Sequence, residues 1–375
     1  MATWAQRFCD DRPYALAPYS KRNWGGRLHS LCSYQGKLKP SIAHFLIKWF
    51  TEPDAVVLDP MSGVGTIPLE ARIQGRTAIA SDLSDLAVAV SRAKLESADE
   101  ASSMRVVNEL ATAISANELS LEDLIQEEHA DFGLNGVITD YFHQDTLREL
   151  LVARRFFAAT GVDNPGSASV LTAILHVLHG NRPYALSRRS HPITPLKPTG
   201  EFSYRPLIAH VEKRLSQTLP ELSELPGEGR SLKADFGALP LTPGSVDAVI
   251  TSPPFAQSLR FFSSNWMRLW FCGWSPEDFR DRPAGYLESE QKHGFDDAYR
   301  RFFRAMHETL REDGLLVMHV GATHKFDMAE HLLPLLAPEF RLIYDGAEHL
   351  DGPESHGLSD KGSTVRHHFL FCRRV

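Results

Sequence analysis

The chain has 375 residues, of which 43% are apolar and 23% charged, as in a globular protein with one large domain and an insertion, or with two domains. The net charge of −7 argues against nucleic-acid binding through overall charge, so such binding needs a local basic patch. No apolar run could span a membrane or form a signal peptide, and we expect a cytoplasmic protein without a membrane partner. The four cysteines lie far apart and form no Cys-x-x-Cys pair, so neither a disulfide framework nor a metal site is predicted.

The first 30 residues are predicted to form an irregular basic arm. After Pro40 the apolar residues recur at helical spacing, and proline suits the first turn of a helix. Tyr34 and Lys37 come just before this helix. Taken alone, this pattern is also that of an ordinary packing helix.

A strand over residues 56–58 is predicted to end at Asp59, and the glycine-containing turn Asp-Pro-Met-Ser-Gly-Val-Gly-Thr follows over residues 59–66. Gly63 and Gly65 allow tight curvature and a close approach of the backbone to a ligand. The helix that comes next offers free N–H groups to an anion. The pattern is not the Gly-x-Gly-x-x-Gly dinucleotide fingerprint, and it lacks the Gly-Lys-Ser/Thr of a P-loop.

A second strand, over residues 77–81, is predicted to end at Asp82. This acidic residue comes about twenty residues after the glycines, where doubly wound folds bond the hydroxyls of a ribose. Capping of the next helix, predicted over residues 86–95, is the alternative role.

Residues 96–229 are predicted to be mainly helical, and they include the most basic stretch of the chain. Aromatic and hydroxyl side chains alternate there with the cations, which suits phosphate contacts and base reading. A solvated loop is the alternative interpretation. The candidate nucleic-acid-binding residues are Arg182, Tyr184, Arg188, Arg189, Lys197 and Arg205.

A fourth strand, over residues 246–250, leads into Thr-Ser-Pro-Pro-Phe at residues 251–255. The two prolines stop the strand and begin a stiff turn. The hydroxyl of Ser252, the carbonyl of Pro253 and the ring of Phe255 can together hold a planar amino-heterocycle. A turn that only closes the strand is the alternative.

Seven strands are predicted in all, alternating with helices, which favours a mainly parallel sheet with one antiparallel strand. The third is expected near residues 231–235, and the last three over residues 315–321, 342–344 and 365–371. Between the fourth and fifth, Trp266, Trp270 and Trp274 share one helical face and are expected in the core.

The motifs at residues 59–66 and 251–255 together resemble those of the amino-directed DNA methyltransferases. The resemblance implies an α/β, Rossmann-like methyltransferase fold that binds S-adenosyl-L-methionine. It assigns residues 31–95 and 230–375 to the catalytic domain and leaves 96–229 as a helical insertion, a candidate target-recognition region. The cofactor-binding residues that it implies are Tyr34, Lys37, Asp59, Pro60, Gly63, Gly65, Thr66, Asp82 and Asp235, although Asp235 could instead cap a turn.

The implied reaction is methyl transfer to an exocyclic amino group of a base flipped out of duplex DNA. Its catalytic residues would be Ser252, Pro253, Pro254 and Phe255. Relatives with Ser-Pro-Pro commonly act on cytosine N4, so this target is favoured over adenine N6. Methylation of an RNA base and a catalytically inactive nucleic-acid-binding protein are the other hypotheses. A restriction endonuclease is a candidate partner.

Overall fold

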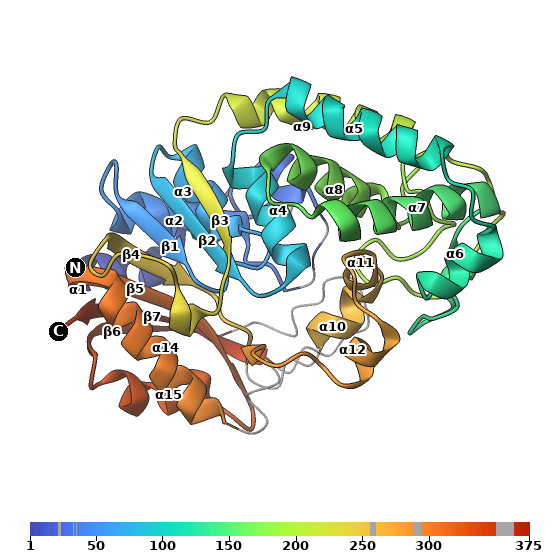
Figure 1. Ribbon diagram of the computed structural model, residues 1–375. Coiled ribbons are helices and arrows are strands. Elements are labelled where there is room, and N and C mark those ends of the chain that lie inside the picture. Colours follow the sequence, from blue (N-terminus) through green and yellow to red (C-terminus); the bar gives the residue numbers. More distant parts are fainter. Residues whose placement is uncertain (22–23, 33, 35, 256–259, 288–293, 350–363) are drawn as a thin grey trace.

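A computed structural model describes residues 1–21, 24–32, 34, 36–255, 260–287, 294–349 and 364–375. Its centre is one seven-stranded sheet in the order β3-β2-β1-β4-β5-β7-β6 (Figure 1). The strands are β1 (Val56–Asp59), β2 (Thr77–Asp82), β3 (Gly229–Lys233), β4 (Val246–Thr251), β5 (Leu310–Thr323), β6 (Phe340–His349) and β7 (Thr364–Arg374).

Strands β1 to β5 pair in parallel, and β7 is antiparallel to both of its neighbours, β5 and β6. The prediction of a mainly parallel, seven-stranded sheet with one antiparallel strand is thereby confirmed. The order 3-2-1-4-5 is that of a doubly wound sheet. With β7 inserted between β5 and β6, the architecture is the Rossmann-like methyltransferase fold.

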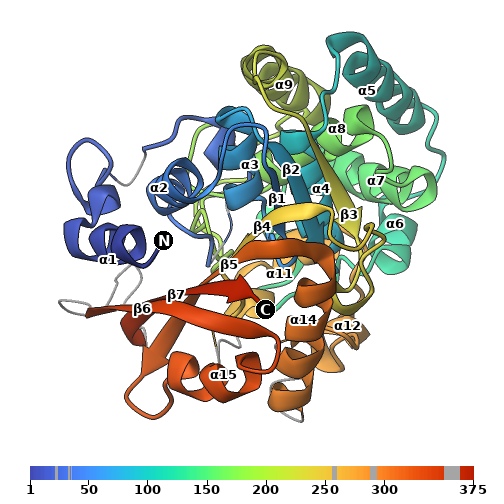
Figure 2. The same ribbon diagram turned by 90° about the vertical axis from the view of Figure 1, so that its left-hand side faces the viewer.

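Helices cover both faces of the sheet, as Figure 2 shows from a second direction. On one face α1 (Ala2–Asp11), α2 (Pro40–Phe50) and α3 (Thr66–Ile73) bury an apolar layer, together with the last residue of α4 (Asp85–Leu95). On the other face α14 (Phe295–Thr309) and α15 (Met328–Leu336) bury a second layer. Alternating side chains of the central strands supply both layers, because successive residues of a strand point to opposite faces.

The N-terminal segment differs from its prediction as an irregular arm. Residues 2–11 form α1, and 3-10 turns follow at Pro13–Ala15 and Leu28–Ser30. Phe8 is fully buried, and its ring contacts those of Phe369 and Phe371 on β7. Packing of this aromatic residue against the sheet therefore orders the segment, a contact that local composition does not reveal.

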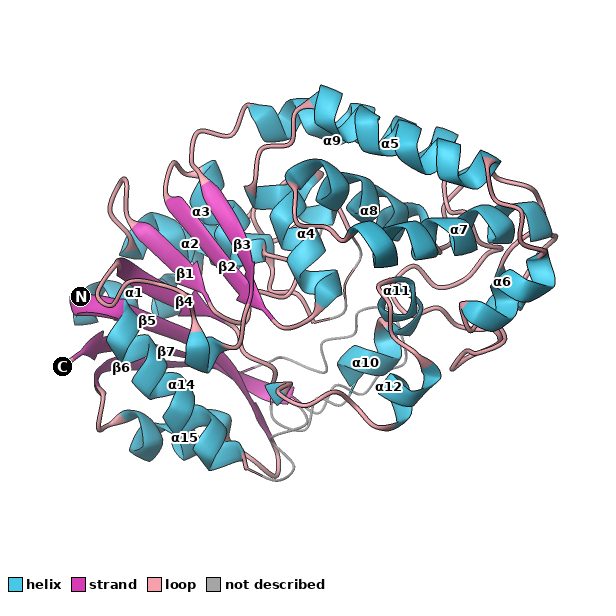
Figure 3. Cartoon of the chain, in the orientation of Figure 1, coloured by secondary structure: helices cyan, strands magenta, loops and turns pink. Residues whose placement is uncertain are grey.

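The predicted helical character of residues 96–229 is confirmed for most of the segment (Figure 3). Its helices are α5 (Glu100–Ser115), α6 (Leu121–Glu127), α7 (Gln144–Thr160), α8 (Pro165–Val177) and α9 (Leu207–Ser223), with a 3-10 turn at Ile138–Tyr141. Residues 178–206 form a long connection without helix. They carry the basic stretch, which therefore lies on a loop.

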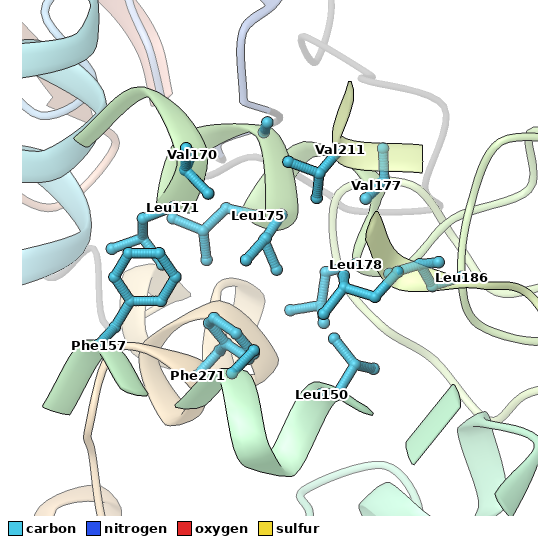
Figure 4. Close-up of a cluster of buried hydrophobic side chains, with 14 of the residues drawn as sticks. Leu150, Phe157, Val170, Leu171, Leu175, Val177, Leu178, Leu186, Val211 and Phe271 are labelled. Atoms are coloured by element: carbon cyan, nitrogen blue, oxygen red, sulfur yellow. The ribbon is translucent and has the colours of Figure 1, made fainter. Parts of the chain in front are cut away.

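The insertion shares its core with the segment that follows the fourth strand. Figure 4 shows Phe271 among apolar side chains of the insertion, such as Leu150 and Leu175. Phe271 belongs to α11 (Trp266–Phe271), which lies between the short helices α10 (Arg260–Ser264) and α12 (Pro276–Arg280). The chain after the Thr-Ser-Pro-Pro-Phe motif is thus anchored on the insertion.

The three tryptophans at four-residue spacing are buried, as predicted, but α11 ends at Phe271, so Trp274 does not share a helical face with the other two. The indole N–H of Trp266 donates to the carbonyl of Pro195 at 3.1 Å, and that of Trp270 donates to the carbonyl of Glu128 at 2.8 Å. Both rings therefore join α11 to the insertion through a hydrogen bond as well as through apolar packing.

Candidate active site

The two sequence motifs meet at one edge of the sheet. β1 and β4 are parallel neighbours, so the turns that follow them leave the sheet on the same side (Figure 1). The hydroxyl of Thr251 donates to a carboxylate oxygen of Asp59 at 2.7 Å, and Asp59 also accepts from the N–H of Met61 at 3.2 Å. In parallel sheets the carboxyl ends of the strands are where ligands bind.

The turn after β1 requires its two glycines. Gly63 and Gly65 have φ of +50° and +68°, which residues with a Cβ rarely adopt. A Cβ at Gly65 would lie 2.8 Å from the hydroxyl of Ser91, and a Cβ at Gly63 would lie 3.4 Å from the ring of Tyr34. Since Gly65 immediately precedes α3, the free N–H groups of the first helical turn lie at this bend.

The rest of the Asp-Pro-x-x-Gly-x-Gly-Thr motif shapes the same turn. Pro60 and Thr66 are buried, and Thr66 is the first residue of α3. Helix α4 supports the turn from behind: Ser91 donates to the carbonyl of Gly63 at 3.0 Å, and the ammonium of Lys94 donates to the carbonyl of Val64 at 2.5 Å. Lys94 is fully buried, and this burial lowers its pKa to about 7.

Asp82 braces the glycine turn. One of its carboxylate oxygens accepts from the N–H of Gly63, and the other accepts from the N–H of Ser84, both at 2.9 Å. Ser84, and not Asp82, is the N-cap residue of α4, so the capping alternative for Asp82 is wrong. The contact of Asp82 with a ribose stays a prediction.

Asp59 and Asp82 bring two carboxyl groups to this edge of the sheet. Burial raises the pKa of Asp59 to about 7 and that of Asp82 to about 6. Within the described ranges neither forms an ion pair with a lysine or an arginine. Buried carboxylates without a counter-ion favour a ligand that carries positive charge.

The segment before α2 also reaches the turn. The ring of Tyr34 lies against Gly63 and 5.3 Å from the ring of Phe261, between centroids. Lys37 donates to the carbonyl of His29 at 2.9 Å. The structure therefore brings Tyr34 to the glycine turn, and it gives Lys37 a contact that holds its own segment in place.

The turn after β4 presents a hydroxyl and an aromatic ring. Ser252, Pro254 and Phe255 are partly exposed, and Pro253 is buried. The hydroxyl of Ser252 lies 3.2 Å from Nδ1 of His319, a buried residue of β5. The ring of Phe255 lies 5.6 Å from the rings of both His319 and His367, between centroids.

The ring of Phe255 packs against Gly321 of β5. A Cβ at Gly321 would lie 2.6 Å from the ring of Phe255, so only glycine leaves room for it. Sequence reasoning missed the roles of His319, Gly321 and His367. A signal existed: a histidine and a glycine interrupt the apolar run predicted as the fifth strand, over residues 315–321. In the structure Thr251 faces Met318 across β4 and β5, one residue before His319.

Asp235 lies after β3 and caps the turn that follows. Its carboxylate accepts from the N–H of Gly237 at 2.7 Å and forms an ion pair with Arg301 at 3.6 Å. The capping role that the sequence left open is confirmed. A contact of Asp235 with an adenine ring stays a prediction.

The basic stretch divides into residues that face solvent and residues that hold the loop. Arg182, Arg189 and Lys197 are exposed. Arg188 donates to the carbonyls of Gly200 and Asp140, at 2.7 and 2.9 Å.

Arg205 donates to the carbonyl of Ser187 at 3.2 Å. Tyr184 is exposed, and its ring stacks on that of His176 at 5.0 Å between centroids. Three cations of the stretch are therefore available to a ligand, and Arg188 and Arg205 chiefly maintain the loop.

Two further features, a metal-binding group and a membrane-spanning helix, are absent from the described residues. In the part of the chain that the structure describes, no group of three or more histidine, cysteine, aspartate or glutamate side chains is placed to bind a metal ion. None of the described helices is long and apolar enough to cross a membrane.

Comparison with known proteins gives one match to a family. Residues 27–126 match the UPF0020 family, described as RMKL-like, methyltransferase domain. This range holds the glycine turn, Asp82 and Lys94. No curated protein matches the chain.

Solved structures with a related arrangement include three methyltransferases. TrmN from Thermus thermophilus is 15% identical, with a TM-score of 0.35, over 91% of this chain and 50% of its own, so the chain spans half of TrmN. An S-adenosylmethionine-dependent methyltransferase from Methanosarcina mazei is 9% identical, with a TM-score of 0.35, over 88% of this chain and 97% of its own. The rRNA methyltransferase aviRa from Streptomyces viridochromogenes is 12% identical, with a TM-score of 0.35, over 96% of this chain and 95% of its own.

At these identities the substrates of the three enzymes say nothing about the substrate of this chain. The strand order, the glycine turn and the family match to residues 27–126 agree with one another. Residues 27–126 thus match a methyltransferase domain by sequence, and the glycine turn that they hold fits S-adenosyl-L-methionine as cofactor.

Proposed function

We propose that this protein transfers a methyl group from S-adenosyl-L-methionine to an exocyclic amino group of a DNA base, with cytosine N4 as the target. The observation that carries the proposal is the adjacency of the two turns. The Ser252 hydroxyl and the Phe255 ring come from the strand next to the glycine turn, and Thr251 is hydrogen-bonded to Asp59. An acceptor and donor of a methyl group bound to these turns would be neighbours.

The residues of the glycine turn fit the cofactor. Gly63 and Gly65 let a ligand approach the backbone, and the first turn of α3 offers N–H groups to its carboxylate. Asp82 would accept from the ribose hydroxyls. The buried carboxyls of Asp59 and Asp82 favour a positively charged ligand. When bound, S-adenosylmethionine supplies an electrophilic methyl group on a cationic sulfur.

The proline turn fits the amino group and the base that carries it. The hydroxyl oxygen of Ser252 and the carbonyl of Pro253 would accept from the N–H bonds of the amine, which keeps its lone pair directed at the methyl group. Phe255, supported by Gly321, would stack on the face of the base. Positioning of the two reacting groups supplies much of the rate, and no covalent protein nucleophile is needed. The amine would release one proton to solvent as its bond to the methyl group forms.

Contact with DNA is supported by the exposed cations of the basic loop. Arg182, Arg189 and Lys197 face solvent. The loop is tied to α11, since Arg268 donates to the carbonyl of Ile193 at 3.2 Å and Trp266 to that of Pro195. α11 follows the proline turn in the chain, so the loop is connected to the segment that bears the catalytic motif. An exocyclic amine of a paired base would have to be flipped out to reach Ser252.

The test is transfer of a labelled methyl group to unmethylated duplex DNA, followed by mass spectrometry of the nucleosides. N4-methylcytosine is the expected product. N6-methyladenine would keep the chemistry and overturn the choice of base. Transfer to RNA alone, under the same conditions, would overturn the choice of DNA. Cofactor binding without methyl transfer to any nucleic acid would overturn the proposed activity and favour a catalytically inactive binding protein.

A further inference from the structure

A buried histidine stands behind the hydroxyl of the catalytic motif. His319 lies on β5, is 4% exposed, and places Nδ1 at 3.2 Å from the Ser252 hydroxyl oxygen. Ser252 itself is partly exposed, so a substrate can reach it while His319 stays covered. The two residues come from neighbouring parallel strands, which holds their separation through the backbone of the sheet.

The surroundings of His319 keep it neutral. Its ring contacts the rings of Phe255, Phe369 and His367, with centroids 5.6, 4.8 and 4.7 Å away. Burial lowers the pKa of His319 well below its usual value, and the neighbouring His367 lowers it further. The ring therefore has one protonated and one unprotonated nitrogen at neutral pH.

The second ring nitrogen is an unsatisfied polar atom. Nε2 of His319 is buried and has no hydrogen-bond partner among the described residues. Among the described residues, the contact of Nδ1 with Ser252 is therefore the hydrogen bond that can orient this imidazole. A buried nitrogen without a partner destabilises the fold, a cost that an apolar residue at this position would avoid.

We propose that His319 is a positioning residue for methyl transfer: its Nδ1 accepts the hydroxyl hydrogen of Ser252 and thereby turns the Ser252 lone pairs toward the substrate amine. This inference rests on the proposed function. A serine hydroxyl can donate or accept. If it donated to the amine, it would occupy the lone pair that must attack the methyl group. With its hydrogen held by His319, Ser252 can only accept from the amine.

The first test is a double-mutant cycle in the full-length protein. His319→Phe keeps the ring volume and removes Nδ1, and we expect it to lower kcat about 5- to 10-fold, the usual weight of one neutral hydrogen bond, with KM for DNA and Kd for the cofactor unchanged. In the Ser252→Ala background the same change should have no further effect. An undiminished effect in that background, or a rise in KM without a fall in kcat, would overturn the proposal.

A conservative variant guards against a general loss of folding. In His319→Asn the amide oxygen can take the place of Nδ1 as acceptor, so kcat should recover to within about twofold to threefold of the wild type. If the asparagine variant is as slow as the phenylalanine variant, although both unfold as cooperatively as the wild type, the proposal is wrong.

The second test does not depend on activity. The ¹⁵N spectrum of histidine-labelled protein, assigned with His319→Phe, should show Nε2 protonated and Nδ1 unprotonated, and the Nδ1 resonance should move in Ser252→Ala. The opposite tautomer would overturn the inference. A wild-type protein that transfers no methyl group to DNA would instead overturn the proposed function, and the spectrum would still report on the Ser252–His319 contact.

Discussion

The turns after β1 and β4 lie side by side at one edge of the sheet, yet they are built from opposite kinds of residue. The first bends through two glycines with left-handed φ, so its backbone is open to a ligand. The second contains two consecutive prolines, which have no N–H to offer and restrict φ. It therefore relies on side chains, and a serine hydroxyl and an aromatic ring are partly exposed there.

Under the function proposed above, the difference lets one sheet edge serve two ligands. A flexible cofactor with a carboxylate, a ribose and a cationic sulfur needs backbone donors and acidic side chains. A flat base with an amino group needs acceptors in a fixed place and a ring to stack on. Asp59 links the two turns, since it accepts from Met61 in the first and from Thr251 in the second.

The largest effect should come from the proline turn. Ser252→Ala removes the acceptor that we propose for the substrate amine, and we expect kcat to fall about 100-fold, as when one hydrogen bond to the reacting group of an enzyme is lost. Cofactor affinity, measured by calorimetry, should be unchanged because Ser252 belongs to the other turn. Transfer at the wild-type rate would show that the motif has been misassigned.

The glycine turn should show the reverse behaviour. Gly65→Ala forces a Cβ into a left-handed conformation at 2.8 Å from Ser91. To relieve the contact the turn must open, and we expect cofactor affinity to fall by on the order of 2 kcal/mol, or tens of fold.

Gly75→Ala is the matched control for this change. Gly75 also has a left-handed φ, of +79°, but nothing lies within 4 Å of the Cβ that alanine would add. We expect this variant to lose stability but to keep the wild-type affinity for the cofactor. Equal losses of affinity in the two variants would mean that backbone strain, and not the shape of the turn, explains the result.

Gly321→Ala should disturb the proline turn without touching the glycine turn. The added Cβ would displace the ring of Phe255, and we expect kcat to fall about 10-fold because the base is then held in a shifted position. Cofactor binding should persist. A fall in cofactor affinity of the same size would contradict the separation of the two turns.

The two buried carboxyls predict opposite effects of pH on folding and on cofactor binding. Their folded-state pKa values, about 7 for Asp59 and about 6 for Asp82, lie above the usual value, so their contribution to stability is complete below pH about 4 and is lost as the pH rises through 6 to 7. The free energy of unfolding of the free protein should therefore fall over this window, by at most about 1.4 kcal/mol per pH unit for each group.

Binding of the cationic cofactor favours the ionised carboxylates, so its affinity should rise between pH 6 and 8, by up to about tenfold through Asp59 and about twofold through Asp82. Asp59→Asn should flatten both profiles in part, as followed by urea unfolding and calorimetry. Profiles that keep their slope in this variant would show that Asp59 does not titrate in the window.

The smallest effect is expected outside the sheet edge. Arg189→Ala and Lys197→Ala should each weaken DNA binding about threefold and lower the slope of log affinity against log salt by about 1, since each removes one phosphate contact. Arg230→Ala, an exposed cation on β3, is the matched control and should change neither. Equal effects of all three variants would point to overall charge and would remove the basic loop from the DNA interface.

Much of the fold could be predicted because its signals are local. The apolar strands, the strand ends at Asp59 and Asp82, and the breaks caused by glycine and proline depend on the residues themselves. α1 escaped prediction, since its buried Phe8 packs on residues that include Phe369 and Phe371, more than 300 positions later in the chain.

By itself the sequence determined which turn bends through glycine and which is stiffened by proline, because both residue types act on their own φ. The tertiary structure alone decided what surrounds those turns. His319 lies 67 positions after Ser252, and only the register of β4 on β5 brings them within hydrogen-bond distance. The same holds for Gly321 beneath Phe255 and for the hydrogen bond between Thr251 and Asp59, since contacts across a sheet depend on strand order and pairing, which no local pattern encodes.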